Sequence, residues 1–276
     1  MRADETVLFT DLDGTLFSSS GTVSPENRAA IEAYIAAGGM FAIATGREPG
    51  NALTFIGDLP QNAPAIVVNG CGVYDFSRGE YLKCWFLDRE RLIPWLRELM
   101  AEFPDMELQA YTERGICYCT PEETANPQLL AMHSPRTFTT LDALTDASFF
   151  KCFVYAPIER EERLYAKLMA GESDGIFRHV PGTTDVGGPI TYHEMLPQDV
   201  SKGSAVDYLR EHPAIRGRTI LAVGDFWNDY ELLEAADVAV APANAIDEVK
   251  AICRYTTVSN NEHVIKHIVE DIIPTL

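Results

Sequence analysis

A short apolar run that ends in two acids constrains this chain more than any other feature. Residues 7–10 (VLFT) are typical of a buried strand, and residues 11–16 (DLDGTL) follow directly. Because strand side chains alternate between faces, we expect Asp11 and Asp13 to point the same way at the carboxyl end of this strand. Ligands bind at that end of open α/β sheets, although a strand closing in an Asx turn would leave the same pattern.

The segments that follow alternate between helix and strand signals. A serine and a proline at positions 24 and 25 predict a helix that ends at Gly38, and residues 40–44, 48–57 and 65–68 predict strand, helix and strand. This order is typical of a parallel sheet. The same alternation resumes after Ser201. Helices are expected at 201–209, 228–236, from 245 onward and at 261–273, and strands at 219–223, 238–240 and 254–257.

The middle of the chain has a different pattern of predicted helices and strands. Two helical stretches, near 88–102 and 159–171, lie among short β-like runs at 106–111, 115–119, 149–155 and 175–180, and residues 121–148 are loop-like. Adjacent strands mixed with helices predict an α+β unit with an antiparallel sheet. We therefore predict an α/β core built from residues 1–84 and 191–276, with an α+β domain inserted at 85–190.

Charge and composition exclude several classes of partner. The chain has 276 residues, with 22 basic against 41 acidic side chains and a net charge of −19, which repels nucleic acid and anionic lipid. No stretch of about 18 apolar residues predicts a membrane span, and the charged N-terminus is not a secretory signal. Six cysteines without a CxxC pair predict reduced thiols and a cytoplasmic protein.

Two motifs after predicted elements suit an anion. Thr45, Gly46 and Arg47 follow a buried strand and precede a helix, so a hydroxyl, a backbone N–H and a helix start converge there. Lys202 lies in the first turn of a predicted helix, where the helix dipole disfavours a cation unless an anion such as phosphate accompanies it. A common loop and a solvated surface lysine are the alternatives for the two motifs.

A second group of acids follows the strand predicted at 219–223. Asp225 ends that strand, and Asp229 lies about one helical turn further on. With Asp11 they would form a carboxylate cluster, and hard oxygen ligands at close range favour Mg²⁺. The alternative is that both acids cap a helix.

In this order the motifs resemble those of the haloacid dehalogenase superfamily of phosphohydrolases. Residues 11–16 look like its first motif, 45–47 its second, Lys202 its third, and 224–229 its fourth. The long interval between Arg47 and Lys202 is similar to the Cof-type branch, which inserts an α+β cap there. Residues 67–70 (VVNG) also match the family's strand before the cap. The resemblance implies a Rossmann-like parallel-sheet core, over roughly residues 5–85 and 190–274.

The resemblance also implies a mechanism and a set of roles. Asp11 would be the nucleophile that forms an aspartyl-phosphate, and Asp13 the general acid and base. Mg²⁺ would bind the Asp11 and Asp225 carboxylates and the Asp13 backbone carbonyl. Asp229 would bind the Mg²⁺ directly or through a water molecule. The remaining roles are substrate binding by Thr45, Gly46, Arg47, Lys202 and Asn228, where Arg47 could equally form a structural salt bridge and Asn228 could orient Asp225 or Lys202.

These features predict a Mg²⁺-dependent phosphatase of small phosphorylated metabolites, with sugar phosphates favoured. A sugar phosphomutase uses the same nucleophile, and a non-enzymatic binding protein could keep the same scaffold, so both remain alternatives. The expected partner is a small-molecule phosphate ester, with no nucleic acid and no membrane. The chain is expected to be a monomer or a weak homo-oligomer.

Overall fold

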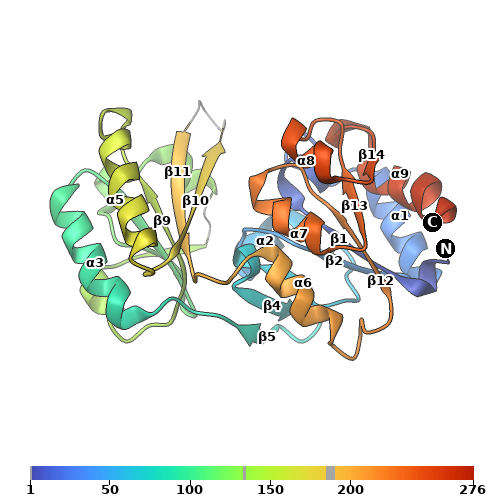
Figure 1. The fold of residues 1–276 in the computed structure, drawn as a ribbon, viewed down its shortest axis with the longest axis horizontal. Coiled ribbons are helices and arrows are strands. Elements are labelled where there is room, and N and C mark those ends of the chain that lie inside the picture. Colours follow the sequence, from blue (N-terminus) through green and yellow to red (C-terminus); the bar gives the residue numbers. More distant parts are fainter. Residues whose placement is uncertain (1, 133–134, 185–189) are drawn as a thin grey trace. The chain divides into compact units, whose positions relative to one another are not determined.

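The computed structural model describes residues 2–132, 135–184 and 190–276, which fold into two compact units (Figure 1). The first, called the core unit here, comprises Met1–Lys83 and Ser201–Leu276. The second, called the inserted unit, comprises Cys84–Val200. That the inserted unit acts as a cap stays a prediction.

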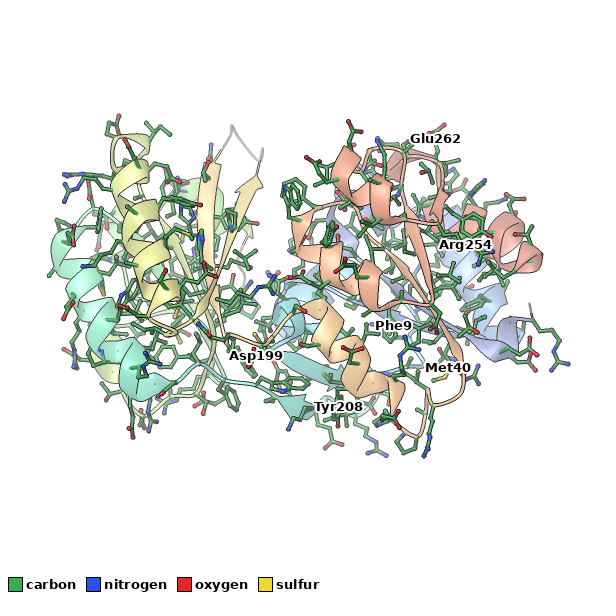
Figure 2. The ribbon with its side chains drawn as sticks, viewed as in Figure 1. Phe9, Met40, Asp199, Tyr208, Arg254 and Glu262 are labelled. Atoms are coloured by element: carbon green, nitrogen blue, oxygen red, sulfur yellow. The ribbon has the colours of Figure 1, made fainter. Side chains whose placement is uncertain are left out.

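Within the described residues, a five-stranded parallel sheet forms the centre of the core unit, in the order β14-β13-β12-β1-β2. Its strands are β1 (Thr6–Thr10), β2 (Met40–Ile43), β12 (Thr219–Val223), β13 (Val238–Ala241) and β14 (Tyr255–Thr256). All of β1 is buried, as expected for a central strand covered on both faces. Figure 2 shows Phe9 of β1 inside this unit, with Arg254 and Glu262 at its exposed edge. The prediction of an α/β fold with a parallel sheet is confirmed.

Each helix of the core unit corresponds to a predicted one, although three of them begin two or three residues later than predicted. They are α1 (Pro25–Ala36), α2 (Pro49–Ile56), α6 (Lys202–Arg210), α7 (Tyr230–Ala235), α8 (Asp247–Ile252) and α9 (Val264–His267). The Ser24 hydroxyl accepts a hydrogen bond from the backbone N–H of Asn27 at the start of α1. The final helix expected near 261–273 begins at Val264, because His263 has a φ of +66° and separates it from a short turn; helical turns then continue over Ile268–Ile272 and Ile273–Thr275.

The third predicted strand joins the sheet differently from what was expected. β3 (Ala65–Val67) is linked to the five-stranded sheet by one parallel bridge, between Ile66 and Ala44, the residue after β2. Instead it pairs antiparallel with β4 (Gly72–Asp75), which is followed by β5 (Glu80–Cys84). The reason is the tight reversal of the chain at Val68–Gly70, which turns β3 back into a hairpin.

The inserted unit is an α+β structure, as predicted. In the part that the structure describes, its sheet has the order β10-β11-β9-β6-β7-β8, antiparallel except between β7 and β8. The strands are β6 (Glu107–Thr112), β7 (Gly115–Tyr118), β8 (Arg136–Phe138), β9 (Phe149–Tyr155), β10 (Arg178–Thr184) and β11 (Ile190–Leu196). The helices are α3 (Arg89–Glu102), α4 (Pro127–Met132) and α5 (Glu161–Ser173).

The segment 121–148 is not the loop that its composition predicted. It contains α4 and β8, because β8 finds a parallel partner in β7 that no local pattern announces. Residues 133 and 134 of this segment lie outside the described residues.

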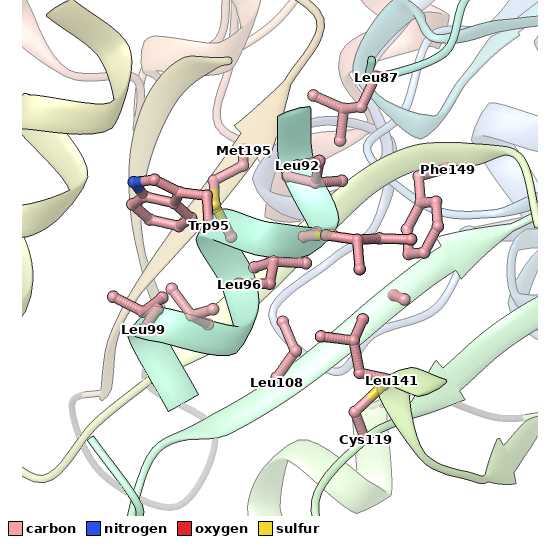
Figure 3. Packing of buried hydrophobic residues seen from close by; sticks show 14 of the residues in the cluster. Leu87, Leu92, Trp95, Leu96, Leu99, Leu108, Cys119, Leu141, Phe149 and Met195 are labelled. Atoms are coloured by element: carbon pink, nitrogen blue, oxygen red, sulfur yellow. The ribbon is translucent and has the colours of Figure 1, made fainter. Parts of the chain in front are cut away.

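One apolar core holds the inserted unit together. The buried side of α3, with Leu92, Leu96 and Leu99, packs on the sheet beside Leu108 and Phe149 (Figure 3). The Trp95 ring meets the Phe177 ring edge-on, with centroids 4.8 Å apart. This packing fixes α3 and the sheet as one body.

A buried histidine pair lies under α5 in the inserted unit. His179 and His193 face each other on β10 and β11, and their Nε2 and Nδ1 atoms are 2.8 Å apart. The other ring nitrogen of His193 is 2.8 Å from the Glu161 carboxylate. Burial lowers the pKa of His179 to about 4, and the His193 charge adds to this. The pair is therefore neutral near pH 7.

Candidate active site

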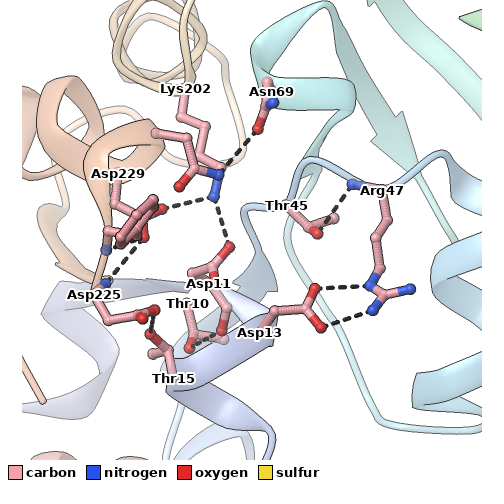
Figure 4. A network of polar contacts seen from close by, with 12 residues as sticks. Thr10, Asp11, Asp13, Thr15, Thr45, Arg47, Asn69, Lys202, Asp225 and Asp229 are labelled. Carbon is pink, nitrogen blue, oxygen red and sulfur yellow. Dashed lines mark hydrogen bonds and ion pairs between the residues drawn. The ribbon is translucent and has the colours of Figure 1, made fainter. Parts of the chain in front are cut away.

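The predicted site residues meet at the carboxyl ends of β1, β2 and β12 (Figure 4). Asp11 follows β1, Thr45 follows β2, and Asp225 follows β12, while Lys202 is the first residue of α6. Parallel strands all end at the same edge of a sheet, so residues far apart in the chain converge there. Every one of these groups belongs to the core unit.

Lys202 lies between two carboxylates in the interior. Its side chain is 0% exposed, and its Nζ is 2.6 Å from an oxygen of Asp11 and 2.6 Å from one of Asp229. Burial by itself would lower the pKa of Lys202, but the charges of Asp11 and Asp229 outweigh it and raise this pKa. The alternative of a solvated surface lysine is wrong. The Ser201 hydroxyl accepts from the Ser204 N–H, which fixes the start of α6 and hence this lysine.

Asp225 is held from two sides. Its Oδ1 accepts a hydrogen bond from the Thr15 hydroxyl at 2.7 Å, and its backbone N–H donates to the Asp229 carboxylate at 3.0 Å. A Cβ on Gly14 would come within 2.4 Å of the Asp225 carboxylate, so only glycine fits there, with its φ of +79°. Burial and the nearby Asp229 charge raise the pKa of Asp225 to about 7.

Two buried acids and one half-buried acid form a group that fits a divalent cation. Asp11, Asp225 and Asp229 each offer an oxygen within 4.8 Å of the others. Burial raises the pKa of Asp11 well above its ordinary value, and the Asp229 charge raises it further. Lys202 balances one of the three negative charges, which leaves two for a divalent cation to balance. All-oxygen donors of this kind match Mg²⁺.

Asp229 has two roles in this group. One oxygen binds Lys202, and the other accepts from the backbone N–H groups of Asp225 and Phe226. The helix-capping alternative is therefore partly correct for Asp229, whose carboxylate both closes a turn and faces the site.

Asp13 is exposed and does not join the carboxylate group, although its charge helps to raise the pKa of both Asp11 and Asp225. β1 ends at Thr10, and Leu12–Leu16 form an irregular turn in which Asp13 keeps extended dihedral angles and Gly14 has a φ of +79°. The Asp13 carboxylate, 59% exposed, accepts from Arg47 Nη2 at 2.7 Å and from Nε at 2.9 Å. The salt-bridge alternative for Arg47 is thus the contact observed, and the guanidinium also donates to Asn51 and lies over the Phe55 ring.

Thr45, Gly46 and Asn228 all lie against Asn69. The Thr45 hydroxyl accepts from the Arg47 N–H at 3.2 Å. The Asn228 amide donates to the Asn69 side chain at 3.3 Å, so the expectation that Asn228 hydrogen-bonds Asp225 or Lys202 is wrong. The structure brings all the predicted site residues into one region of the core unit (Figure 4).

Three residues of this region were not among the predicted site residues. They are Thr15, which binds Asp225, Asn69, which binds Asn228, and Asn244, which donates to the Gly14 carbonyl at 2.7 Å. Asn69 and Asn244 fall within segments that resemble the family, and Thr15 belongs to its first motif. Their position in these segments could have indicated that all three residues lie near the site.

Solved structures share this fold over nearly the whole chain. The crystal structure of TM0651 from Thermotoga maritima has a TM-score of 0.78 at 24% identity, covering 96% of this chain and 97% of the other. The structure of BT4131, titled a sugar phosphatase of haloacid dehalogenase subclass IIB, has a TM-score of 0.76 at 20% identity, covering 95% and 97%.

The chain belongs to the haloacid dehalogenase-like hydrolase family, whose model matches residues 8–269. A relative from Bacillus subtilis, named 5-amino-6-(5-phospho-D-ribitylamino)uracil phosphatase YwtE, is 26% identical over 95% of this chain and 96% of its own length. The predicted family is confirmed, and the relative's name agrees with the predicted class of phosphoric monoester hydrolase. Among the described residues, the helices are too short or too polar to cross a membrane.

Proposed function

We propose that this chain is a Mg²⁺-dependent phosphatase of small phosphorylated metabolites, with sugar phosphates the first class to test. One observation carries this proposal: a fully buried lysine pairs with the buried carboxylates of Asp11 and Asp229, and the half-buried Asp225 carboxylate lies within 4.8 Å of both, at the carboxyl edge of the sheet. Such a group is costly to fold unless charged ligands complete it. The names of YwtE and BT4131 support phosphorylated small molecules as the substrates.

In this proposal Asp11 is the nucleophile. An oxygen of Asp11 attacks phosphorus, the new P–O bond forms as the bond to the leaving alcohol breaks, and an aspartyl-phosphate results. The hydrogen bond from Lys202 fixes one oxygen of Asp11 and leaves the other to attack. Water then attacks phosphorus, the bond to Asp11 breaks, and orthophosphate leaves.

Asp13 moves the proton in both steps. Its carboxyl group gives a proton to the leaving oxygen in the first step and takes one from the attacking water in the second. The 59% exposure of the Asp13 side chain supports this role, because the group can reach an incoming alcohol. Arg47 holds it between turnovers.

The remaining residues hold the phosphoryl group. Lys202 Nζ, the Thr45 hydroxyl, the Gly46 N–H and the Asn228 amide would donate to its oxygens, which carry the charge in the transition state. Asp11, Asp225, the Asp13 backbone carbonyl and Asp229 would hold Mg²⁺. Bound Mg²⁺ supplies the positive charge that allows an anionic carboxylate to approach an anionic phosphate.

The inserted unit, Cys84–Val200, is proposed as the Cof-type cap that the sequence predicted over residues 85–190. Acting as such a cap, it would restrict the substrate to small molecules. The support for this is the family membership and the α+β structure of the unit.

A substrate panel with matched variants tests the proposal. Phosphorylated sugars, nucleotides and cofactors are assayed for phosphate release with Mg²⁺ and with a chelator. Hydrolysis is expected only with Mg²⁺, and Asp11→Asn should lower kcat by at least about 10³-fold, since it removes the nucleophile. Asp58→Asn, at an aspartate 95% exposed in the core unit, is the control. Retained Mg²⁺-dependent turnover in Asp11→Asn would remove the nucleophile from the proposal.

A further inference from the structure

The turn at Val68–Gly70 has an unusual backbone. Val68 and Asn69 have φ values of +52° and +53°, in the left-handed region that non-glycine residues rarely adopt. For a β-branched valine this conformation is strained, and it persists only where the surroundings impose it. Val68 is 0% and Asn69 6% exposed, so the strain lies in the interior of the core unit.

The backbone of this turn binds the predicted phosphate loop. The Val68 N–H donates to the Arg47 carbonyl at 3.0 Å, and the Asn69 N–H donates to the Thr45 carbonyl at 3.0 Å. These two bonds join the left-handed residues to both ends of residues 45–47. The position of the Gly46 N–H therefore depends on the conformation of Val68 and Asn69.

The side chain of Asn69 reaches two more predicted phosphate ligands. Its Oδ1 accepts from Asn228 at 3.3 Å. A Cβ on Gly46 would lie 2.8 Å from the same oxygen, so the amide packs directly on the loop backbone. Behind it, a Cβ on Gly70 would lie 2.0 Å from the Ser201 carbonyl and 2.9 Å from Lys202 N, so the turn also packs against the start of α6.

We propose that Asn69 is a positioning residue of the phosphate site. Asn69 joins residues 45–47 to Asn228, while the neighbouring Gly70 packs the same turn against the start of α6, and the backbone strain is retained because it aims the amide between Gly46 and Asn228. This inference rests on the proposed function, which assigns phosphate to that site. Asn69 acts through Asn228 and Gly46 and need not touch the substrate.

A purely structural explanation makes a different prediction. Asparagine tolerates the left-handed conformation better than most residues, so it could be present only to form the turn. Asn69→Gly separates the two explanations, because glycine adopts this backbone without strain and removes the amide. His263→Gly is the matched control, since His263 has a φ of +66° and lies outside the predicted site residues.

The experiment measures orthophosphate binding to the full chain by calorimetry in MgCl₂, together with turnover and the melting temperature. Asn69→Gly is expected to keep the wild-type melting temperature within a few degrees while phosphate binds about tenfold more weakly. Asn228→Ala should have a similar effect. The double variant should be no weaker than either single variant, because the two changes remove one shared interaction.

Two results would overturn the role of Asn69. Phosphate affinity within twofold of wild type in Asn69→Gly would leave only the turn-forming role, and so would losses that multiply in the double variant. A wild-type chain that binds phosphate but hydrolyses no ester would contradict the proposed function alone, since the phosphate titrations still test Asn69. A wild-type chain that binds no phosphate would overturn both.

Discussion

Replacing Lys202 by methionine tests the central arrangement of charges. Methionine has a similar length and no charge, so Lys202→Met leaves the packing nearly intact and removes the only cation in contact with Asp11 and Asp229 within the described residues. The two carboxylates are 8% and 1% exposed, so water cannot replace the lost partner. The variant should therefore be destabilised and inactive.

The size of the destabilisation follows from the burial of the ion pairs. Removing one partner of a buried pair costs about 3–5 kcal/mol. Asp229 still accepts from the backbone N–H groups of Asp225 and Phe226, so the lower end, about 3 kcal/mol, is expected. For a chain of this size that is a fall in melting temperature of roughly 6–12 °C.

The loss should also depend on pH. Without Lys202 the folded-state pKa of Asp11 rises further above its unfolded value. Stability from such a group is complete below the unfolded pKa and is lost as the pH rises through the folded pKa. The difference between variant and wild type should therefore grow between pH 5 and pH 8.

Thermal unfolding at pH 5 and pH 8, with EDTA and with MgCl₂, measures both effects. Lys83→Met, at an exposed lysine of the same unit, is the control. Mg²⁺ should stabilise Lys202→Met more than wild type, because the site then has one more uncompensated negative charge. Equal melting temperatures at pH 8 in EDTA, or a deficit independent of pH, would refute the reasoning. Turnover should fall at least about 100-fold.

Two further predictions concern proton transfer and the inserted unit. Arg47→Met should lower kcat about 10–100-fold for an alkyl phosphate, because the leaving alkoxide needs a proton from Asp13. The loss should be much smaller for nitrophenyl phosphate. Equal losses of kcat for the two substrates would argue against a role for Arg47 in holding Asp13. The pKa of His179 falls from 6.5 to about 4 in the folded chain, so stability should be complete above pH 6.5 and decrease as the pH falls through this window. The free energy of unfolding should change by about 2 kcal/mol across this window, after a discount for solvent screening. His179→Gln should remove this pH dependence, and an unchanged profile in the variant would show that the His179–His193 pair does not titrate.

The sequence predicted the elements whose cause is local. Ser24, Asp88 and Ser201 each accept the capping hydrogen bond that their position implies, because a cap needs only a side chain and a backbone N–H three residues apart or fewer. The convergence of Asp11, Asp225 and Lys202 could also be predicted, because all parallel strands end at one edge.

Other features depend on a single residue or on distant partners. The ion pair between Asp13 and Arg47 joins two motifs 34 positions apart, and no local pattern specifies which carboxylate the arginine binds. The hydrogen-bond partner of Asn228 could not be predicted, because Asn69 is 159 positions away and reaches Asn228 only from a left-handed turn. No local pattern specifies such a contact.

The balance of charges in the core unit leads to a last prediction. Both cations of the site are already paired, Lys202 with buried acids and Arg47 with an exposed one. The four carboxylates of the site are those of Asp11, Asp13, Asp225 and Asp229. Four negative and two positive charges leave a site of charge −2 on a chain of charge −19, which repels a phosphate dianion.

Phosphate should therefore bind only together with a divalent cation. Titration of the wild type with orthophosphate is expected to show binding in MgCl₂ and at least about 100-fold weaker binding in EDTA, because the cation removes the repulsion. Lowering the pH should relax this requirement, since Asp225 has a pKa of about 7 and becomes neutral below it. Equal phosphate affinity with and without Mg²⁺ at pH 8 would mean that Lys202 and the backbone donors suffice, and the buried acids would then need another explanation.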